Sequence, residues 1–416
     1  MSSEWIDSTL GEFVRLQRGH DLTASEQQPG TVPIMGSAGP NGTHNKALAK
    51  GPGLVIGRSG ASAGRVHFSE VDYWPHNTCL YVTDFLGNNP RFAYYLLQTL
   101  DLAAFNSGSA QPSLNRNFLY SIPLKIPRPV EQDGIVEVLK ALDDRITLLR
   151  ETNATLEAIA QTLFKSWFVD FDPVRAKMEG RTPEGMDEAT AALFPDGFET
   201  SELGEVPRGW RVGMICDFAQ LKKGSVNPGS QPEVTFEHFS LPSFDAGQRP
   251  IFELGESIKS NKTPVTQDAV LLSKLNPHIP RIWLPVECGS NAVCSTEFLV
   301  FVPTGAGSRE LIYCAFSSPD FIARLQQLVT GTSNSHQRIK PDQVALMSSV
   351  VPTADVARAF EAVVKPIFQK VFANREQAQT LSTLRDTLLP RLISGQLRLP
   401  EAQAASEAAL GGTLSV

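Results

Sequence analysis

Polar loop segments carry the side chains of this sequence that are best suited to chemistry, because guanidinium, ammonium, carboxamide and imidazole groups stand there among glycines and serines. Arginine and lysine bind the acceptor edge of guanine or a phosphate, and asparagine and glutamine bind adenine. Glycine lets the backbone approach a ligand closely. The alternative is that these are ordinary solvated loop residues. The candidates in the first half of the chain are Asn41, His44, Lys46, Arg58, Ser59, Arg65, Gln111, Asn115 and Arg116. The candidates in the second half are Lys274, Asn276, His278, Arg281, Asn334, His336, Arg338 and Lys340.

The sequence contains no convincing motif of an enzyme that acts without partner subunits. A DNA methyltransferase needs a tetrad of the type Asn/Asp/Ser-Pro-Pro-aromatic, and Ser318–Phe321 lacks its second proline. The glycine-rich stretch 51–64 has neither the spacing nor the Lys-Ser/Thr of a phosphate loop. The histidines are isolated, and the five cysteines form no Cys-x-x-Cys pair, so neither a metal site nor a disulfide framework is expected. We expect no cofactor and no catalytic residues.

Composition indicates an ordinary globular protein. The chain has 416 residues, of which 42% are hydrophobic and 19% charged, enough for two or three domains. No apolar run is long enough for a membrane span, and the N-terminal stretch lacks the pattern of an export signal, so a cytoplasmic location is expected. The net charge of −7 means that any phosphate-binding surface must be local.

An internal repeat decides the domain organisation. The segment Trp5–Gly19 aligns with Trp210–Gly224, and from Pro127 and Pro352 onward the two copies stay 225 residues apart without a gap. Short apolar runs bounded by Gly, Pro and Asn predict strands in each copy, so each copy is predicted to be an α+β domain followed by a long helix. The expected boundaries are 1–128 and 208–353 for the domains, 129–168 and 354–396 for the helices, 169–207 for a linker and 397–416 for a flexible tail.

The two long helices are predicted to pack on one another. Apolar residues recur in the first helix at alternating spacings of four and three, which is the pattern of a coiled-coil seam. In an antiparallel pair Asn153 can face Asn374 and fix the register, while Trp167 meets Phe360. The alternative is that each helix packs on its own domain and the asparagines face water. The seam positions are Ile135, Leu139, Leu142, Ile146, Leu149, Asn153, Leu156, Ala160, Leu163 and Trp167.

Antiparallel packing of two copies predicts a pseudo-two-fold arrangement with one domain toward each end of the helix pair. Thirty or so helical residues span roughly 45 to 50 Å. Two non-identical domains held that far apart suit a bipartite target, as dimeric DNA readers suit two half-sites.

In its helical and intervening segments the sequence resembles the specificity subunit of type I restriction–modification systems. The resemblance rests on Ser113–Ile146, on Leu163–Trp210 and on Leu384–Leu397, which together cover about a third of the chain. The resemblance implies two target-recognition domains that each read one half of an asymmetric double-stranded DNA site, with the helices setting the unread spacer. The candidate loop residues would then contact DNA.

The resemblance also implies partners: two methyltransferase subunits that dock on this chain, and restriction subunits that join them for cleavage. S-adenosylmethionine and ATP would belong to those partners. One departure is that the first helix begins Pro129–Ile135 with a Glu-Gln pair that the second helix lacks. Two other functions stay open on the residues alone, a stand-alone DNA methyltransferase or nuclease and a protein-interaction rod.

Overall fold

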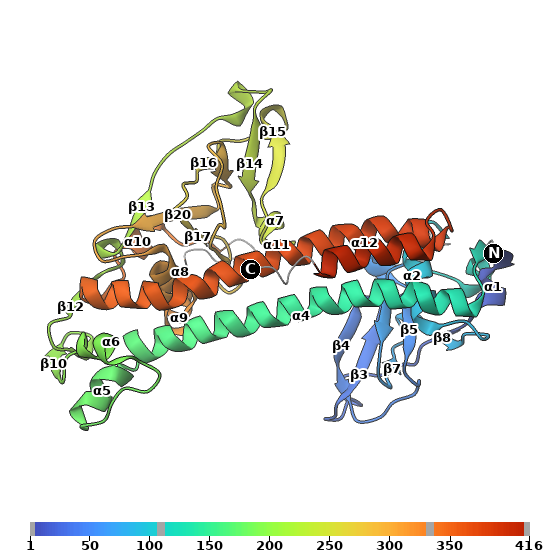
Figure 1. Ribbon diagram of the computed structural model, residues 1–416, viewed down its shortest axis with the longest axis horizontal. Coiled ribbons are helices and arrows are strands. Elements are labelled where there is room, and N and C mark those ends of the chain that lie inside the picture. Colours follow the sequence, from blue (N-terminus) through green and yellow to red (C-terminus); the bar gives the residue numbers. More distant parts are fainter. Residues whose placement is uncertain (1–4, 106–112, 330–336, 412–416) are drawn as a thin grey trace. The chain divides into compact units, whose positions relative to one another are not determined.

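The computed structural model describes residues 5–105, 113–329 and 337–411, and these fold into two compact units. Unit 1 consists of Met1–Arg150 with Glu376–Val416, and unit 2 consists of Glu151–Arg375. The long helices α4 (Pro129–Phe168) and α11 (Ala354–Ile393) therefore each contribute one segment to each unit. The expected mixture of helices and sheets in two halves is confirmed (Figure 1).

Unit 1 is built on two sheets and a strand pair. One sheet has the order β2-β8-β5-β6, a second has the order β4-β3-β7, and β1 pairs with β9. Strands β3 and β7 run parallel, whereas the other pairs are antiparallel. The strands are β1 Ile6–Thr9, β2 Arg15–Arg18, β3 Val32–Gly36, β4 Gly39–His44, β5 Gly53–Gly57, β6 Val66–Ser69, β7 Trp74–Pro75, β8 Cys79–Asp84 and β9 Pro123–Ile126.

Unit 2 repeats this topology and adds strand β16 at the edge of its second sheet. Its sheets have the orders β13-β20-β17-β18 and β15-β14-β19-β16, its strand pair is β12 with β21, and its parallel pair is β14 with β19. The strands are β12 Arg211–Met214, β13 Ala219–Lys222, β14 Thr235–Phe239, β15 Ile251–Leu254, β16 Thr263–Pro264, β17 Val270–Ser273, β18 Ile282–Trp283, β19 Ala292–Cys294, β20 Phe298–Pro303 and β21 Ser348–Val351. The two copies found in the sequence are thus also two copies of one fold.

Short helices complete each unit. The segment 309–328 forms two helices, because Ser318 ends the first and caps the second, which opens with Pro319. The short helices of unit 1 are α1 Leu10–Phe13, α2 Pro90–Gln98, α3 Arg116–Leu119 and α12 Leu399–Gly411. Those of unit 2 are α5 Asp172–Met178, α6 Glu188–Ala192, α7 Leu241–Asp245, α8 Arg309–Ser317, α9 Pro319–Gln327 and α10 Pro341–Ala345.

In unit 2 the segments of α4 and α11 pack antiparallel, as expected. The Asn374 amide donates to the Asn153 Oδ1 at 2.9 Å, and both side chains are buried. Farther along, the rings of Trp167 and Phe360 meet edge to face with centroids 5.6 Å apart. The alternative in which the asparagines face water is therefore wrong.

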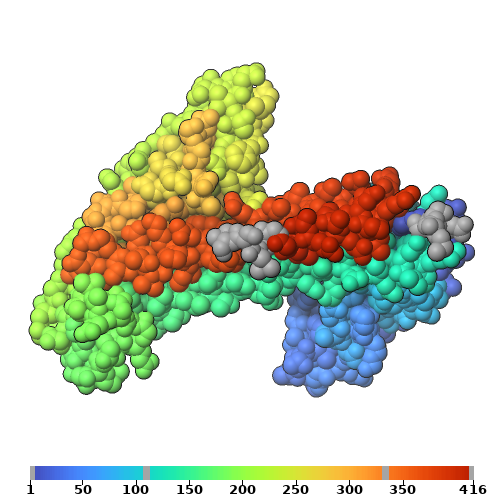
Figure 2. All heavy atoms as spheres, viewed as in Figure 1, coloured from blue at the N-terminus to red at the C-terminus, as the bar shows by residue number. Residues whose placement is uncertain are grey.

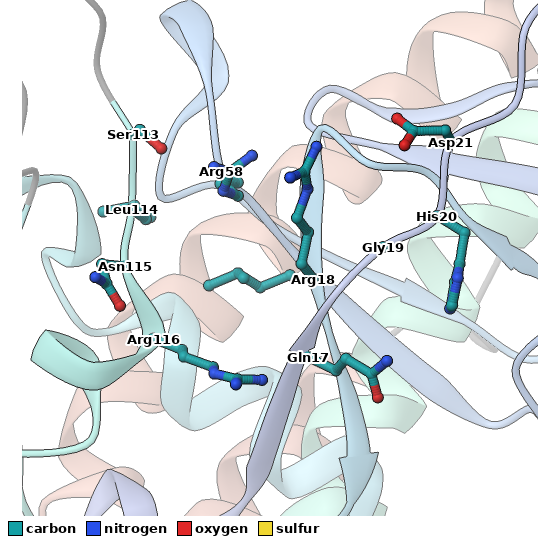
Figure 3. A pocket seen from close by; sticks show the side chains of 11 residues that line it. Gln17, Arg18, Gly19, His20, Asp21, Arg58, Ser113, Leu114, Asn115 and Arg116 are labelled. Atoms are coloured by element: carbon teal, nitrogen blue, oxygen red, sulfur yellow. The ribbon is translucent and has the colours of Figure 1, made fainter.

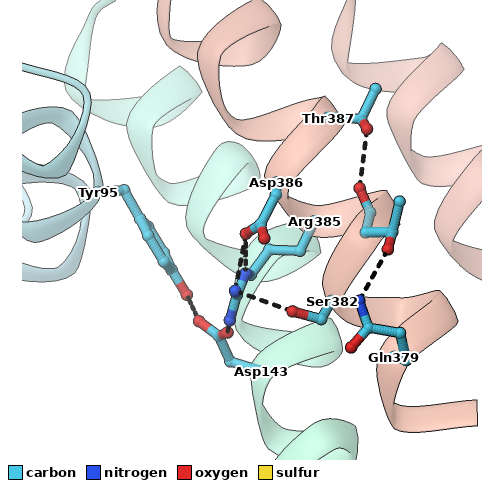
Figure 4. A network of polar contacts seen from close by, with 8 residues as sticks. Tyr95, Asp143, Gln379, Ser382, Arg385, Asp386 and Thr387 are labelled. Atoms are coloured by element: carbon cyan, nitrogen blue, oxygen red, sulfur yellow. Dashed lines mark hydrogen bonds and ion pairs between the residues drawn. The ribbon is translucent and has the colours of Figure 1, made fainter. Parts of the chain in front are cut away.

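In unit 1 the helix segments bury the leucines of the predicted seam and add a polar network (Figure 4). Asp143 of α4 accepts hydrogen bonds from Arg385 of α11 at 2.7 Å and from the Tyr95 hydroxyl of α2 at 2.6 Å. Arg385 also pairs with Asp386 and donates to Ser382. The network therefore ties the globular part of unit 1 to both long helices.

The segment 169–207, expected to be a linker, is folded. It contains α5, α6 and the hairpin of β10 (Phe198–Ser201) with β11 (Gly204–Pro207). Its aromatic side chains belong to the core of unit 2, where Phe171 and Phe194 pack against Trp210. Proline, glycine and charge favoured a linker, but burial of the aromatic rings decides the structure.

The segment expected to be a flexible tail contains α12. Ala402 is fully buried, and the Leu399 side chain fills the space beside Gly134 of α4, where an added Cβ would lie 2.4 Å from Leu399 Cδ2. In the space-filling view α12 lies against the C-terminal part of α11 (Figure 2). Helix α12 follows α11 as α5 follows α4, so the repeat extends past the long helices.

Candidate nucleic-acid interface

A hollow of about 830 Å³ opens on unit 1 at the ends of strands β2 and β5 (Figure 3). It gathers residues from four separate parts of the sequence, including three of the arginines of unit 1. The lining residues are Gln17, Arg18, Gly19, His20, Asp21, Arg58, Leu80, Ser113, Leu114, Asn115 and Arg116. The structure thus brings together three predicted contact residues, Arg58, Asn115 and Arg116.

Backbone pairing explains why these segments meet. Arg58 directly follows β5, and its carbonyl accepts the N–H of Leu114 at 2.9 Å. Leu114 is buried, so its neighbours Ser113 and Asn115 in this extended segment face outward. Arg18 ends β2, and the next residue must be small, because a Cβ on Gly19 would lie 2.0 Å from the carbonyl oxygen of His76.

The hollow is positively charged. Arg116 donates to the carbonyl of Leu16 at 3.1 Å, which holds its guanidinium at the rim. Within the described part of the chain, no hydrogen bond or ion pair engages the side chains of Arg18 and Arg58. The one carboxylate of the lining, Asp21, accepts from the Asn77 amide. Guanidinium groups that no protein carboxylate neutralises can bind phosphate or guanine.

One end of the Asn115 side-chain amide already forms a hydrogen bond within the protein. Its Oδ1 accepts the N–H of Asn117 at 3.0 Å and so caps the short helix α3. The Nδ2 group remains as a hydrogen-bond donor on an exposed side chain. Ser59 lies beside the hollow, where it forms an antiparallel bridge with Ser113.

The other described candidates of unit 1 lie outside the hollow, with Asn41 and His44 on strand β4 and Lys46 and Arg65 in loops. Asn41, Lys46 and Arg65 are exposed. His44 is buried, accepts the N–H of Gln28 at its Nδ1 and packs edge to face on Trp74. A ring held in this way supports the loop and offers little to a ligand.

Unit 2 forms the same backbone framework with different residues. The N–H of Ile339 donates to the carbonyl of Lys274 at 3.1 Å, as Leu114 does to Arg58. The N–H of Lys274 donates to the carbonyl of Glu297 at 2.9 Å, as Arg58 does to Thr78. The predicted loop residues Lys274 and Arg338 therefore come together as their counterparts do in unit 1.

Two arginines of unit 2 are already paired with carboxylates. Arg281 donates through Nε and Nη2 to Asp245 at 2.7 and 2.9 Å, and Arg338 donates in the same way to Glu297 at 3.1 and 3.0 Å. Hydrogen bonding to Asp245 raises the pKa of Arg281, so its charge is permanent. The Arg281 side chain is only 13% exposed.

The remaining candidates of unit 2 are spread over the same loops. His278 and Lys340 are exposed, and Lys340 stands immediately before α10. Asn276 has a left-handed backbone with φ of 50°, a conformation that asparagine tolerates better than most residues. Gln111, Asn334 and His336 lie outside the described residues.

Sequence reasoning missed Arg18, Asp245 and Glu297. A signal for Arg18 existed, because the repeat aligns it with Lys223, a basic residue before glycine in both copies. Nothing in the sequence could pair Arg281 with Asp245 or Arg338 with Glu297, because each pair joins loops that meet only in the folded unit.

Among the described residues no group of three or more His, Cys, Asp and Glu side chains is placed to hold a metal ion. The described helices include none that is both long and apolar enough to cross a membrane.

Comparisons with known proteins agree with this architecture. Residues 2–158 match the family model of the type I restriction modification DNA specificity domain. The chain is 26% identical over 423 residues to the type I restriction enzyme HindI specificity subunit of Haemophilus influenzae, covering 86% of this chain and 88% of that one. It is 25% identical over 329 residues to the MjaIX specificity subunit of Methanocaldococcus jannaschii, covering 74% and 69%.

A solved structure shares the fold. The S subunit of a type I restriction–modification system from M. genitalium superposes with a TM-score of 0.57 at 16% identity, covering 94% of this chain and 96% of that one. The duplicated fold is thus shared with that S subunit, and the first 158 residues contain the match to the DNA specificity domain. In sequence, the chain is therefore similar to type I restriction enzyme specificity subunits over most of its length.

Proposed function

We propose that this chain is the DNA sequence-specificity subunit of a type I restriction–modification complex. Each unit binds one half of a bipartite, asymmetric double-stranded DNA site. The chain carries no methyl transfer or cleavage of its own, and those reactions, with S-adenosylmethionine and ATP, belong to partner subunits.

The observation that carries this proposal is the positively charged hollow of unit 1, together with the matching backbone framework at the corresponding strand ends of unit 2. Arg18, Arg58 and Arg116 line a concave surface at which guanidinium groups meet the phosphates and base edges of a duplex. The chain as a whole is acidic, so this local concentration of arginine is what makes DNA binding favourable. The two units present different side chains, which fits two different half-sites.

DNA binding by the complete chain, assembled with its methyltransferase partner, tests the proposal. Substituting Arg58→Gln should abolish protection of one half-site in a footprint and leave the other half protected, because only unit 1 changes. Lys125→Gln removes one positive charge from an exposed position of the same unit, on β9, and serves as the matched control. Equal loss of both halves with Arg58→Gln would contradict independent recognition by the two units.

We further propose that α4 and α11 set the unread spacer and dock two methyltransferase subunits, which restriction subunits join for cleavage. Both helices are 40 residues long and belong to both units. One heptad inserted into each helix, between residues 150 and 151 and between 375 and 376, adds about 10 Å, or roughly three base pairs. Methylation mapping should then find the same half-sites with a longer spacer, and an unchanged spacer would refute this role.

Methyl transfer by the purified chain alone is the result that favours a stand-alone enzyme. We expect no transfer from S-adenosylmethionine to DNA until methyltransferase subunits are added. Native mass spectrometry of the assembled complex should show two of them for each copy of this chain.

A further inference from the structure

The duplicated framework carries different chemistry at one equivalent position. In unit 1 the residue before the inward-facing Leu114 is Ser113, and the residue whose carbonyl anchors Arg58 is Thr78. In unit 2 the corresponding residues are Arg338, before the inward-facing Ile339, and Glu297, whose carbonyl anchors Lys274. A pair of hydroxyl residues in one copy is thus replaced by an ion pair in the other.

Backbone geometry directs Arg338 outward. Residues 338 and 275 form an antiparallel bridge, so this segment is extended and its side chains alternate between the two faces. Ile339 is 2% exposed, whereas the side chain of Arg338 is 46% exposed. The guanidinium therefore lies on the surface of unit 2, at the strand ends that correspond to those of the hollow in unit 1.

Glu297 holds one particular edge of that guanidinium. The Arg338 Nε donates to Oε2 at 3.1 Å and Nη2 donates to Oε1 at 3.0 Å, a bidentate arrangement. The carboxylate thereby occupies the Nε–Nη2 edge and turns the Nη1–Nη2 edge away from itself. Two parallel N–H donors on that second edge match the O6 and N7 acceptors that guanine presents in the major groove.

Stability does not account for the pair. Exposed ion pairs contribute little to folding because water and salt screen them and both side chains lose freedom. The pair of Arg281 with Asp245 differs, since the arginine is largely buried and joins the residue before β18 to the last residue of α7. An exposed arginine that is held in a fixed orientation favours ligand binding, because the side chain loses less conformational entropy when the ligand binds.

We propose that Arg338 reads a guanine in the half-site bound by unit 2 and that Glu297 is the positioning residue that presents it. This inference rests on the proposed function and deepens it, because it names a base and a residue pair. Unit 1, with Ser113 and Thr78 at the same position, has no equivalent reader, so the guanine contact belongs to one half-site.

The test is selection of binding sites from a randomised duplex library by the complete chain with its methyltransferase partner. The wild-type consensus should contain a guanine in the unit 2 half. Arg338→Gln should reduce discrimination at that one base by about 10- to 100-fold, the range of a bidentate arginine contact. The unit 1 half should be unchanged.

Glu297→Gln separates positioning from charge. It keeps the side-chain shape but frees Arg338 from its carboxylate, so discrimination at the same base should fall several-fold while non-specific DNA binding strengthens through the added positive charge. A merely structural role would weaken both together. The control is Arg211→Gln, which removes another exposed, carboxylate-paired arginine of unit 2, on β12, and should leave the consensus intact.

The outcomes are distinct. A bipartite consensus without a guanine in the unit 2 half, or one that Arg338→Gln leaves unchanged, overturns this inference and leaves the proposed function standing. If Glu297→Gln alters discrimination at some other base while Arg338→Gln alters none, the positioning role of Glu297 is overturned. Absence of any sequence preference in the assembled wild type overturns the proposed function and the inference together.

Discussion

The side chains of Asn153 and Asn374 meet inside unit 2, where the Asn374 Nδ2 donates to the Asn153 Oδ1 at 2.9 Å. Asn153 in turn donates to the carbonyl of Val371 at 3.0 Å. The two residues are 7% and 2% exposed, so they form a polar contact within an otherwise apolar seam. A buried pair of this kind favours one register, because a shifted register leaves the amides without partners.

Replacing one member of the pair by leucine should destabilise unit 2. Asn153→Leu removes the acceptor of a buried donor, at a cost of about 1–3 kcal/mol. The double variant Asn153→Leu with Asn374→Leu should be more stable than either single variant, because no amide is left unsatisfied. Hydrogen exchange of the α4 and α11 segments of unit 2 measures the effect. Gln369→Leu, on the exposed face of α11, should change little, and a double variant as weak as the singles would argue against direct coupling.

Asp143 and Arg385 should be energetically coupled in unit 1. Their side chains are 22% and 27% exposed, and Asp143 also accepts from Tyr95. A double-mutant cycle with Asp143→Asn and Arg385→Met should give a coupling of about 1–2 kcal/mol in chemical denaturation. The exposed pair of Asp355 with Arg358 is the control and should show almost none. Equal couplings in the two cycles would contradict a role for burial.

Arg18 should contribute to the salt dependence of DNA binding. If the hollow of unit 1 receives a phosphate, Arg18→Gln makes the slope of log affinity against log salt concentration less negative by about one. The affinity should fall by a similar factor for all sequences, because a phosphate contact carries no base preference. The Lys125→Gln variant should keep the wild-type slope. An unchanged slope in Arg18→Gln would place Arg18 outside the phosphate contacts.

Helix α12 should stabilise unit 1. Ala402 is fully buried there, whereas Ala404 on the same helix is exposed. Ala402→Glu should detach α12 from its core at a cost of about 1–3 kcal/mol, the contribution of one small apolar contact surface. Faster hydrogen exchange in the adjoining α4 and α11 segments of unit 1 is the readout. Ala404→Glu should leave that exchange unchanged, and equal effects of the two variants would show that α12 does not dock.

Cysteine reactivity should follow burial. Burial raises the pKa of Cys79, of Cys288 and of Cys294 to about 12, so almost no thiolate forms at these positions near neutral pH. Cys216 is exposed. Brief alkylation of the native chain at pH 8, followed by peptide mass spectrometry, should modify Cys216 first. Early modification of Cys294 would indicate that its sheet opens readily.

The repeat makes much of the fold predictable from the amino-acid sequence. The constant separation of 225 residues along both long helices, together with the matching polar positions, predicts the antiparallel pair and the facing asparagines. The same reasoning failed for 169–207 because proline, glycine and charge outweighed the aromatic residues in it. Phe171 and Phe194 have nothing to pack on in their own segment, and their partner Trp210 lies outside it.

The site was predictable only in part. Residue type selected Arg58, Asn115 and Arg116 as candidates, and the hollow of unit 1 gathers these three side chains. Burial of His44 depends on its contact with Trp74, which is distant in the sequence. The pairing of Arg338 with Glu297 depends on how three loops meet, which neither spacing nor composition encodes.

Unit 2 is a continuous stretch of chain, whereas unit 1 is assembled from the first 150 residues and the last 41. During translation the ribosome therefore releases everything unit 2 requires before it has made the final helix segment that unit 1 needs. The N-terminal sheets must wait, with the seam leucines of early α4 uncovered, until the C-terminal part of α11 emerges. Unit 2 can thus be complete while unit 1 still lacks its second segment, so a chain interrupted between the two would hold one finished half and one open one.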